Sequence, residues 1–237
     1  MTGEYTIQTW TDYYDLLYIS SIPVVSDMHF KNLSVDYRPS EHFDGLLPLW
    51  DSGWDPERGT VPAHQVTDSA LKYATQTENP RFVAHYAQPH VPYIGDEEIL
   101  PWEGVSERGI QERLTDDDQP TKKFYSKIRN GEISDERLQT AYRDNLRYVL
   151  SDVIRLVRRL DCPIVITSDH GEHLGENNKY LHKTDSKKLR EVPWFVVDET
   201  ETSQKEIEDE YQVGFDVEKS TSTDSEVKDR LAHLGYY

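Results

Sequence analysis

Four side chains that can bind a metal ion or an anion stand close together in the string SDHGEHLGENNKYLH. They are Asp169, His170, Glu172 and His182. A carboxylate beside an imidazole suits zinc or manganese better than an all-oxygen ligand set, which favours calcium or magnesium. The adjacent pair Asp169 and His170 is therefore a candidate site for a divalent metal. An Asp-His pair in a loop is more often structural, so residue types alone leave both interpretations open.

The residues around this pair offer supporting roles. His182 follows a compact GENNKY turn, and we expect it to return to the crevice of His170. Two roles are open to Glu172: a hydrogen bond that orients His170, as metal-bound histidines often require, or a cap on the following turn. His173 is expected to point away from the crevice.

Asp169 and His170 follow a predicted strand, at the position where open α/β sheets usually bind their ligands. CPIVIT (162–167) is an apolar, β-branched run that predicts a parallel strand buried on both faces, and VPWFVV (192–197) predicts a second. Ser134 is the expected N-cap of a long helix that precedes them. The apolar stripe of this helix comprises Leu138, Tyr142, Leu146, Val149, Val153, Leu156 and Leu160. The order predicts an open, mostly parallel α/β sheet with helices on both faces, and ligands gather beyond the carboxyl ends of such strands.

The earlier part of the chain is interpreted from its periodicity and its turn residues. DLLYISSIP (15–23) and RFVAHY (81–86) predict strands, and Thr67 is the expected N-cap of a short helix. The apolar side of that helix comprises Val66, Ala70, Tyr73 and Ala74. Residues 37–63 are rich in Pro, Gly, Trp and Asp, so we expect a loop there. Residues 96–131 are charged and interrupted by Pro and Gly, so we expect loops and short helical pieces at the surface.

Composition bounds the class of protein. The chain has 237 residues, and we expect one domain over 1–198 and an acidic, partly disordered tail with a short terminal helix over 199–237. The formal net charge is −18, from 26 basic and 44 acidic residues, which argues against a nucleic-acid partner. The acidic residues are spread along the chain, which favours a halophilic protein in a salt-rich cytoplasm. The sequence shows no secretory leader or membrane-spanning window, so we expect a cytoplasmic protein.

The string TSDHGEHLGE resembles the signature of the alkaline phosphatase superfamily, in particular its sulfatase-like and phosphoethanolamine-transferase-like branches. The resemblance implies that Asp169 and His170 bind the catalytic divalent metal. The continuation GENNKYLH is similar to the GEN-x-x-YLH of the transferases, which implies that His182 contacts the substrate phosphoryl group or a second metal. Sulfatases often place a sulfate-binding lysine at this spacing, and Lys183 stands next to His182.

Three other stretches resemble sulfatase segments. FVAHYAQPHVPYIG looks like the strand and HxPY turn before the long helix, and the resemblance implies that His90 reaches the sulfate or the leaving group. LREVPWFVV looks like the segment that follows the metal loop, and RLAHLGYY is similar to a common sulfatase ending. The resemblance therefore implies a sulfate or phosphate ester as the substrate.

The sequence departs from the family at the front of the site. A complete site needs acidic metal ligands on the first strand and a Ser, Thr or Cys nucleophile shortly after it. Neither is visible, because Cys162 only begins the strand entry CPI. The chain therefore looks like the C-terminal portion of an alkaline phosphatase-like fold, with the N-terminal part missing and no catalytic nucleophile identified. An upstream polypeptide, or a local substitute such as Asp27, would have to complete the site.

Two functions are compatible with these residues. The first is a metal-dependent hydrolase or transferase of sulfate or phosphate esters that is incomplete as this chain alone. The second is a non-catalytic remnant that keeps the fold and binds an anion or a metal. Turnover of an aryl ester would separate them, because only the first function predicts it.

Overall fold

The structure is a computed structural model that describes residues 16–22, 43–100, 120–182 and 185–197. The expected acidic tail and its terminal helix lie outside the described residues. The same holds for Asp27 and for Lys183, the expected sulfate-binding lysine. None of the helices in the described part is long and apolar enough to cross a membrane.

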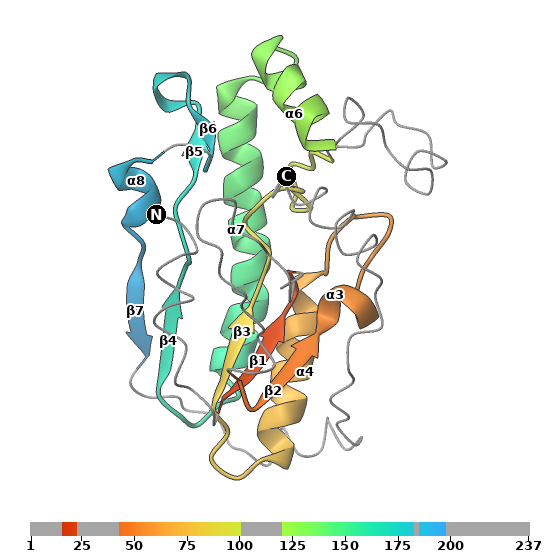
Figure 1. Cartoon of the computed structure of the whole chain (residues 1–237), viewed down its shortest axis with the longest axis vertical. Helices are drawn as coiled ribbons and strands as arrows, with labels where there is room; N and C mark the ends of the chain where they lie inside the picture. Colours follow the sequence, from red (N-terminus) through yellow and green to blue (C-terminus); the bar gives the residue numbers. More distant parts are fainter. Residues whose placement is uncertain (1–15, 23–42, 101–119, 183–184, 198–237) are drawn as a thin grey trace, which may run out of the picture.

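Three short strands form a parallel sheet. They are β1 (Leu17–Ser20), β2 (Gly45–Pro48) and β3 (Phe82–His85), in the spatial order β2-β1-β3 (Figure 1). The buried side chains of Leu17 and Ile19 anchor the central strand in the core. The predicted α/β class with a parallel sheet is thereby confirmed. The sequence did not predict β2, because its GLLP segment is too short to show an alternating pattern between Gly45 and Pro48.

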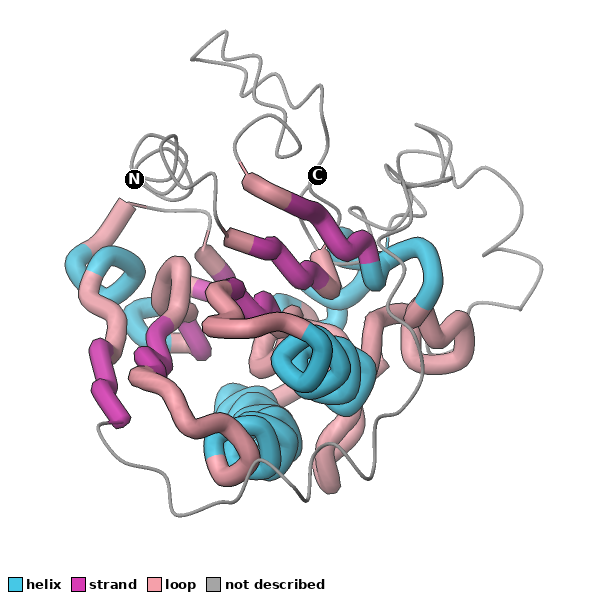
Figure 2. The backbone as a smooth tube through the Cα atoms, turned by 90° about the horizontal axis from the view of Figure 1, so that it is seen from below, coloured by secondary structure: helices cyan, strands magenta, loops and turns pink. Residues whose placement is uncertain are grey.

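Two long helices cover the sheet on one side. After the short helix α3 (Leu49–Ser52), α4 (Ala63–Gln76) leads back to β3 and packs against α7 (Asp135–Val157). Both views place α4 and α7 on the same side of the strands (Figures 1 and 2). The predicted start of α4 was wrong, since the helix begins at Ala63. Thr67 is instead a buried interior residue whose hydroxyl lies 2.8 Å from the hydroxyl of Tyr86.

Helix α7 begins as predicted, but the residues that it buries differ slightly from the predicted apolar set. The Ser134 hydroxyl caps it by accepting a hydrogen bond from the N–H of Arg137 at 3.2 Å. The buried residues are Leu138, Ala141, Asn145, Val149 and Leu156. Leu146, which the periodicity placed in the stripe, is 36% exposed. The polar Asn145 takes the inward position because the loop after β3 offers it hydrogen-bond partners.

The strand before the metal loop differs most from its prediction. β4 (Ile164–Thr167) pairs with β7 (Trp194–Val197) in an antiparallel, two-stranded sheet, so the expectation of two buried parallel strands was wrong. Val165 is 43% exposed and Trp194 is 71% exposed. A parallel pair needs a crossover, usually a helix of a dozen or more residues. Between these strands the described chain holds only a hairpin and the four-residue helix α8 (Lys187–Arg190).

A second core supports the hairpin. The strands β5 (His173–Leu174) and β6 (Tyr180–Leu181) pair antiparallel around a 3-10 turn, η2 (Glu176–Asn178). Beneath them packs α6 (Pro120–Arg129), a ten-residue helix where only short helical pieces were expected. The cluster comprises Val91, Tyr93, Ile99, Phe124, Ile128, Ile133, Leu138, Ala141 and Leu181. The few apolar side chains of α6 are flanked by charged residues in the sequence, so its helical periodicity is weak.

Candidate metal and anion site

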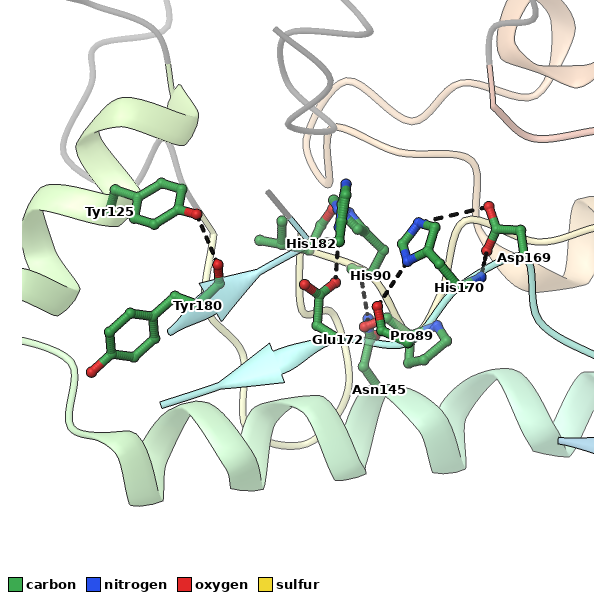
Figure 3. A network of polar contacts seen from close by, with 11 residues as sticks. Pro89, His90, Tyr125, Asn145, Asp169, His170, Glu172, Tyr180 and His182 are labelled. Carbon is green, nitrogen blue, oxygen red and sulfur yellow. Dashed lines mark hydrogen bonds and ion pairs between the residues drawn. The ribbon is translucent and has the colours of Figure 1, made fainter. Parts of the chain in front are cut away.

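The polar residues gather beyond the carboxyl ends of β3 and β4, as the fold class predicts (Figure 3). Asp169 and His170 follow β4, and His90 comes from the loop after β3. Glu172 and His182 stand directly before and after the β5–β6 hairpin. The hairpin returns His182 to His170, as expected, with the two ring centroids 4.2 Å apart.

His170 has the orientation of a metal ligand. Its Nδ1 lies 2.9 Å from the carbonyl oxygen of Gly171, so Nδ1–H donates to that carbonyl and Nε2 carries the lone pair. Nε2 lies 3.7 Å from Oδ2 of Asp169. Two atoms bonded to one zinc ion at about 2.0–2.2 Å each lie at most about 4.4 Å apart. The pair therefore fits a shared divalent ion.

Gly171 sits where only a glycine fits. Its N–H donates to the carbonyl of Leu189 at 3.0 Å, and a Cβ at this position would overlap the backbone carbonyl oxygen of Lys188. The loop that carries Asp169 and His170 is thereby held against α8. This close approach is the physical reason for the glycine in the SDHGE string.

The groups around Asp169 favour its ionised form. Burial works to raise its pKa, but His85, His170 and the N–H of His170 outweigh burial, so the pKa of Asp169 is lowered. His85, at the end of β3, has its Nδ1 2.6 Å from the hydroxyl of Tyr18. Burial lowers the pKa of His85, while Asp169 works against that shift. The sequence suggested only a polar interior position for His85, and the structure places it beside the Asp169–His170 pair.

Glu172 contacts His182, and no hydrogen bond joins it to His170 among the described residues. Its Oε2 lies 3.4 Å from Nδ1 of His182. The carboxylate is only 7% exposed, and its other oxygen, Oε1, has no hydrogen-bond partner in the described part of the chain. Together with His90, these two residues bring three potential ligand atoms within 4.8 Å of one another. The orienting role that the sequence offered Glu172 therefore points to His182.

His90 completes the group from the loop after β3. Its ring centroid lies 5.2 Å from that of His182, and its Nδ1 lies 2.6 Å from the carbonyl oxygen of Val91, to which Nδ1–H donates. Burial lowers the pKa of His90 to about 4, although the charge of Glu172 opposes the shift. His90 is therefore neutral at neutral pH, and Nε2 is the ring atom that it can present to a ligand.

Asn145 of α7 holds the loop that carries His90, and the sequence analysis missed it. Its Nδ2 donates to the carbonyl oxygen of His90 at 3.0 Å, and those of Pro89 and Pro92 also lie within reach at 3.2 Å. Its Oδ1 accepts from the N–H of Ile94 at 3.1 Å. A buried amide inside a helical apolar stripe was the available signal, because it needs partners from another segment.

The hairpin is fixed by both neighbouring helices. Tyr125 of α6 donates to the carbonyl oxygen of Tyr180 at 3.0 Å (Figure 3). The Tyr180 hydroxyl donates to Asp135 of α7 at 2.8 Å. These contacts fix the strand β6, which leads directly into His182. His173 contacts the residue before α8, with its Nε2 2.8 Å from the hydroxyl of Ser186. This contact ties α8 to the hairpin.

Several hydroxyl and thiol groups in the described part are poorly placed as nucleophiles. Ser20 and Ser21, at the end of β1, are fully buried and donate to the carbonyls of Ile22 and His85 at 2.9 and 2.8 Å. Cys162 precedes β4, at the opposite end of that strand from Asp169. Burial raises the pKa of its thiol, which disfavours the reactive thiolate.

A family model described as Sulfatase matches residues 18–219, which is most of the chain. No curated protein and no solved structure gives a significant match. The matched range includes β3, the long helix α7, the metal loop and the hairpin that carries His182.

Proposed function

The chain belongs to the sulfatase family, and from this premise we propose that it contributes the metal- and anion-binding side of a site that hydrolyses sulfate esters. In this proposal Asp169 and His170 hold a divalent metal, for which zinc or manganese suits the donor set best. The single observation that carries it is the convergence of His90, Asp169, His170 and His182 beyond the strand ends. Phosphate esters are the second substrate class, because both anions are tetrahedral oxyanions.

Each residue has a stated task in this proposal. The bound metal would polarise a sulfate oxygen and neutralise developing charge. His170 presents Nε2 to it because Gly171 takes its Nδ1 hydrogen. His90 and His182 flank the position of the anion, and Lys183, outside the described residues, is proposed to add positive charge. The nucleophile and the further acidic ligands would come from residues outside those described, or from a second polypeptide.

Hydrolysis of an aryl sulfate tests the proposal. The full chain is incubated with 4-nitrophenyl sulfate or 4-nitrophenyl phosphate in the presence of Zn²⁺ or Mn²⁺, and Asp169→Ala serves as the control. Metal-dependent release of nitrophenol that the control lacks is the expected result. Equal rates for the chain and the control would overturn the assignment of Asp169 to the reaction.

A binding module without turnover is the second candidate, and the placement of Ser20, Ser21 and Cys162 favours it. In that case the crevice binds a metal and an anion but performs no chemistry. Calorimetry with sulfate in the presence of Zn²⁺ distinguishes the two functions. Binding together with no nitrophenol release supports the module, and turnover refutes it.

A further inference from the structure

We propose that residues 226–234, EVKDRLAHL, form a short helix that docks beside α7 and covers the side of β7 that faces α7. This segment is the expected terminal helix of the sequence, and it lies outside the described residues. It also lies beyond residues 18–219, which match the family model. The proposal uses none of the residues assigned to the metal or the anion, so it does not depend on whether the chain hydrolyses an ester.

The side of β7 that faces α7 is apolar and exposed. Phe195 of β7 lies opposite Ile166 of β4 in register, so it shares one face of the strand pair with Ile166 and Ile164. Ile164 packs against the core cluster that contains Leu156 of α7, so this face is turned toward α7. Phe195 is nevertheless 61% exposed, because β7 lies beyond β4 as seen from α7 (Figure 1). Trp194 points to the opposite face and takes no part in the proposed contact.

One flank of α7 carries a second exposed apolar surface. Leu150, Ile154 and Val157 stand at steps of four and three, so they form one ridge along the helix. Ile154 is 47% exposed, and the other two are partly buried. Helix α4 packs on the other flank of α7, where Arg155 forms an ion pair with Asp68 of α4 at 2.7 Å. A third helix beside α7, in the layer of α4 and α7, would cover this ridge and the exposed side of β7.

Residues 226–234 have the pattern that such a surface requires. Val227, Leu231 and Leu234 also stand at steps of four and three, and charged residues and His233 stand between them. Gly235 follows at the position where helices commonly end. A helix of this length is marginal on its own in water, so it needs an apolar surface to pack against. The ridge on α7 has the same spacing, which suits the packing of two helices side by side.

Reach and charge favour a segment of the same chain as the occupant over a second copy. Residues 198–225 join β7 to the segment, and a chain of about 28 residues spans up to about 90 Å, several times the length of β7. This tether holds the segment near the surface at an effective concentration on the order of millimolar. A second copy would bring together two chains of net charge −18, and their repulsion opposes contact. The segment itself carries two acidic and two basic residues, so its charge does not oppose docking.

Thiol labelling of the full chain tests the proposal on both elements of the surface. A cysteine is introduced by Ile154→Cys on α7 or by Phe195→Cys on β7, in a Cys162→Ser background that removes the native thiol. The rate of reaction with iodoacetamide is measured for each protein. It is measured again after Leu231→Asp and Leu234→Asp are added together, because this pair of aspartates destroys the apolar side of the segment.

Ser151→Cys is the matched control, because Ser151 is exposed on α7 outside the ridge. We expect the aspartate pair to raise the labelling rates of Ile154→Cys and Phe195→Cys by tenfold or more and to leave that of Ser151→Cys unchanged. Val227→Asp takes the place of the pair if circular dichroism shows that the pair prevents folding.

Three results would overturn the proposal. The first is an equal labelling rate at positions 154 and 195 with and without the aspartates. The second is an equal rise at Ser151→Cys, which would show a general loosening of α7. The third is protection that disappears on dilution, because a second copy would then be the occupant. No substrate enters these measurements, so a chain without sulfatase activity can still pass them.

Discussion

The side chain of Asn145, on helix α7, fixes the position of the loop that carries His90. Its amide bonds the backbone on both sides of His90, and it is fully buried. Asn145→Ala leaves several buried backbone groups unpaired, so we expect a loss of about 2–4 kcal/mol in the free energy of unfolding. Urea denaturation measures this loss. Sulfate affinity should fall as well, because the loop that carries His90 is no longer held.

Leu146→Ala is the matched control for this prediction. It removes a larger side chain from the next position of the same helix, but Leu146 is 36% exposed. We expect a cost below about 1 kcal/mol and unchanged sulfate affinity. A larger cost for Leu146→Ala than for Asn145→Ala would show that helix packing, and not the hydrogen bonds to the loop, dominates at this position.

At the residue scale, the sequence was informative where chemistry is local. Asp169, His170 and His182 are close in the chain, and a short turn was enough to predict that they meet. Asn145 and His85 act through partners more than fifty residues away, Ile94 and Asp169 for example. Such pairings depend on how the loop after β3 lies over α7, which no local pattern encodes.

At the element scale, the hairpin that carries His182 is fastened to α8 by Glu176. This carboxylate accepts a hydrogen bond from Lys188 and another from the N–H of Leu174 at 2.9 Å. Burial works in the opposite direction, but these contacts lower the pKa of Glu176 to about 2. Its contribution to stability is therefore present above pH 4.5, the ordinary pKa of the group, and is lost as the pH falls toward 2.

Glu176→Gln tests this pH dependence. Because the side chain is 43% exposed, solvent screening limits the expected loss to below about 1 kcal/mol at pH 7. The difference from the wild type should shrink between pH 4.5 and pH 2, since the wild-type carboxylate becomes neutral there. Urea denaturation at several pH values measures it, with the exposed Glu132→Gln as control. A difference that stays constant over this range would contradict the role of the charge.

The strand elements show where apolar runs mislead. Both CPIVIT and VPWFVV form strands as predicted, yet β4 and β7 pair antiparallel, and Trp194 and Phe195 of β7 are 71% and 61% exposed. An apolar run indicates a strand but carries no information on its neighbour or direction. The connection between the two strands decides both. By contrast, the N-cap Ser134 and its periodic stripe sufficed for α7, because helix contacts are local.

At the scale of the whole molecule, β4 and β7 present an apolar face. Val165 lies opposite Val196 in register, and Trp194 lies on the same face at 71% exposed. Apolar patches of this kind promote association. We expect Trp194→Ser to reduce the apparent mass in light scattering at high protein concentration, with a change in unfolding free energy below about 0.5 kcal/mol. A cost of several kcal/mol would instead show that the rest of the chain covers this face.

The charge of the molecule predicts its response to salt. With a formal net charge of −18, the folded chain holds its carboxylates closer together than the unfolded chain does, so their repulsion opposes folding. The screening length falls from about 10 Å at 0.1 M salt to about 3 Å at 1 M, which removes most of this repulsion. We expect the Tm to rise steeply up to about 1 M KCl. The gain should be smaller at pH 4, where many carboxylates are protonated and less repulsion remains to be screened.

A flat Tm between 0.1 and 2 M KCl would refute the expectation of a halophilic surface. An equal gain at pH 4 and pH 7 would assign the effect to salt-strengthened burial of apolar groups in place of charge screening.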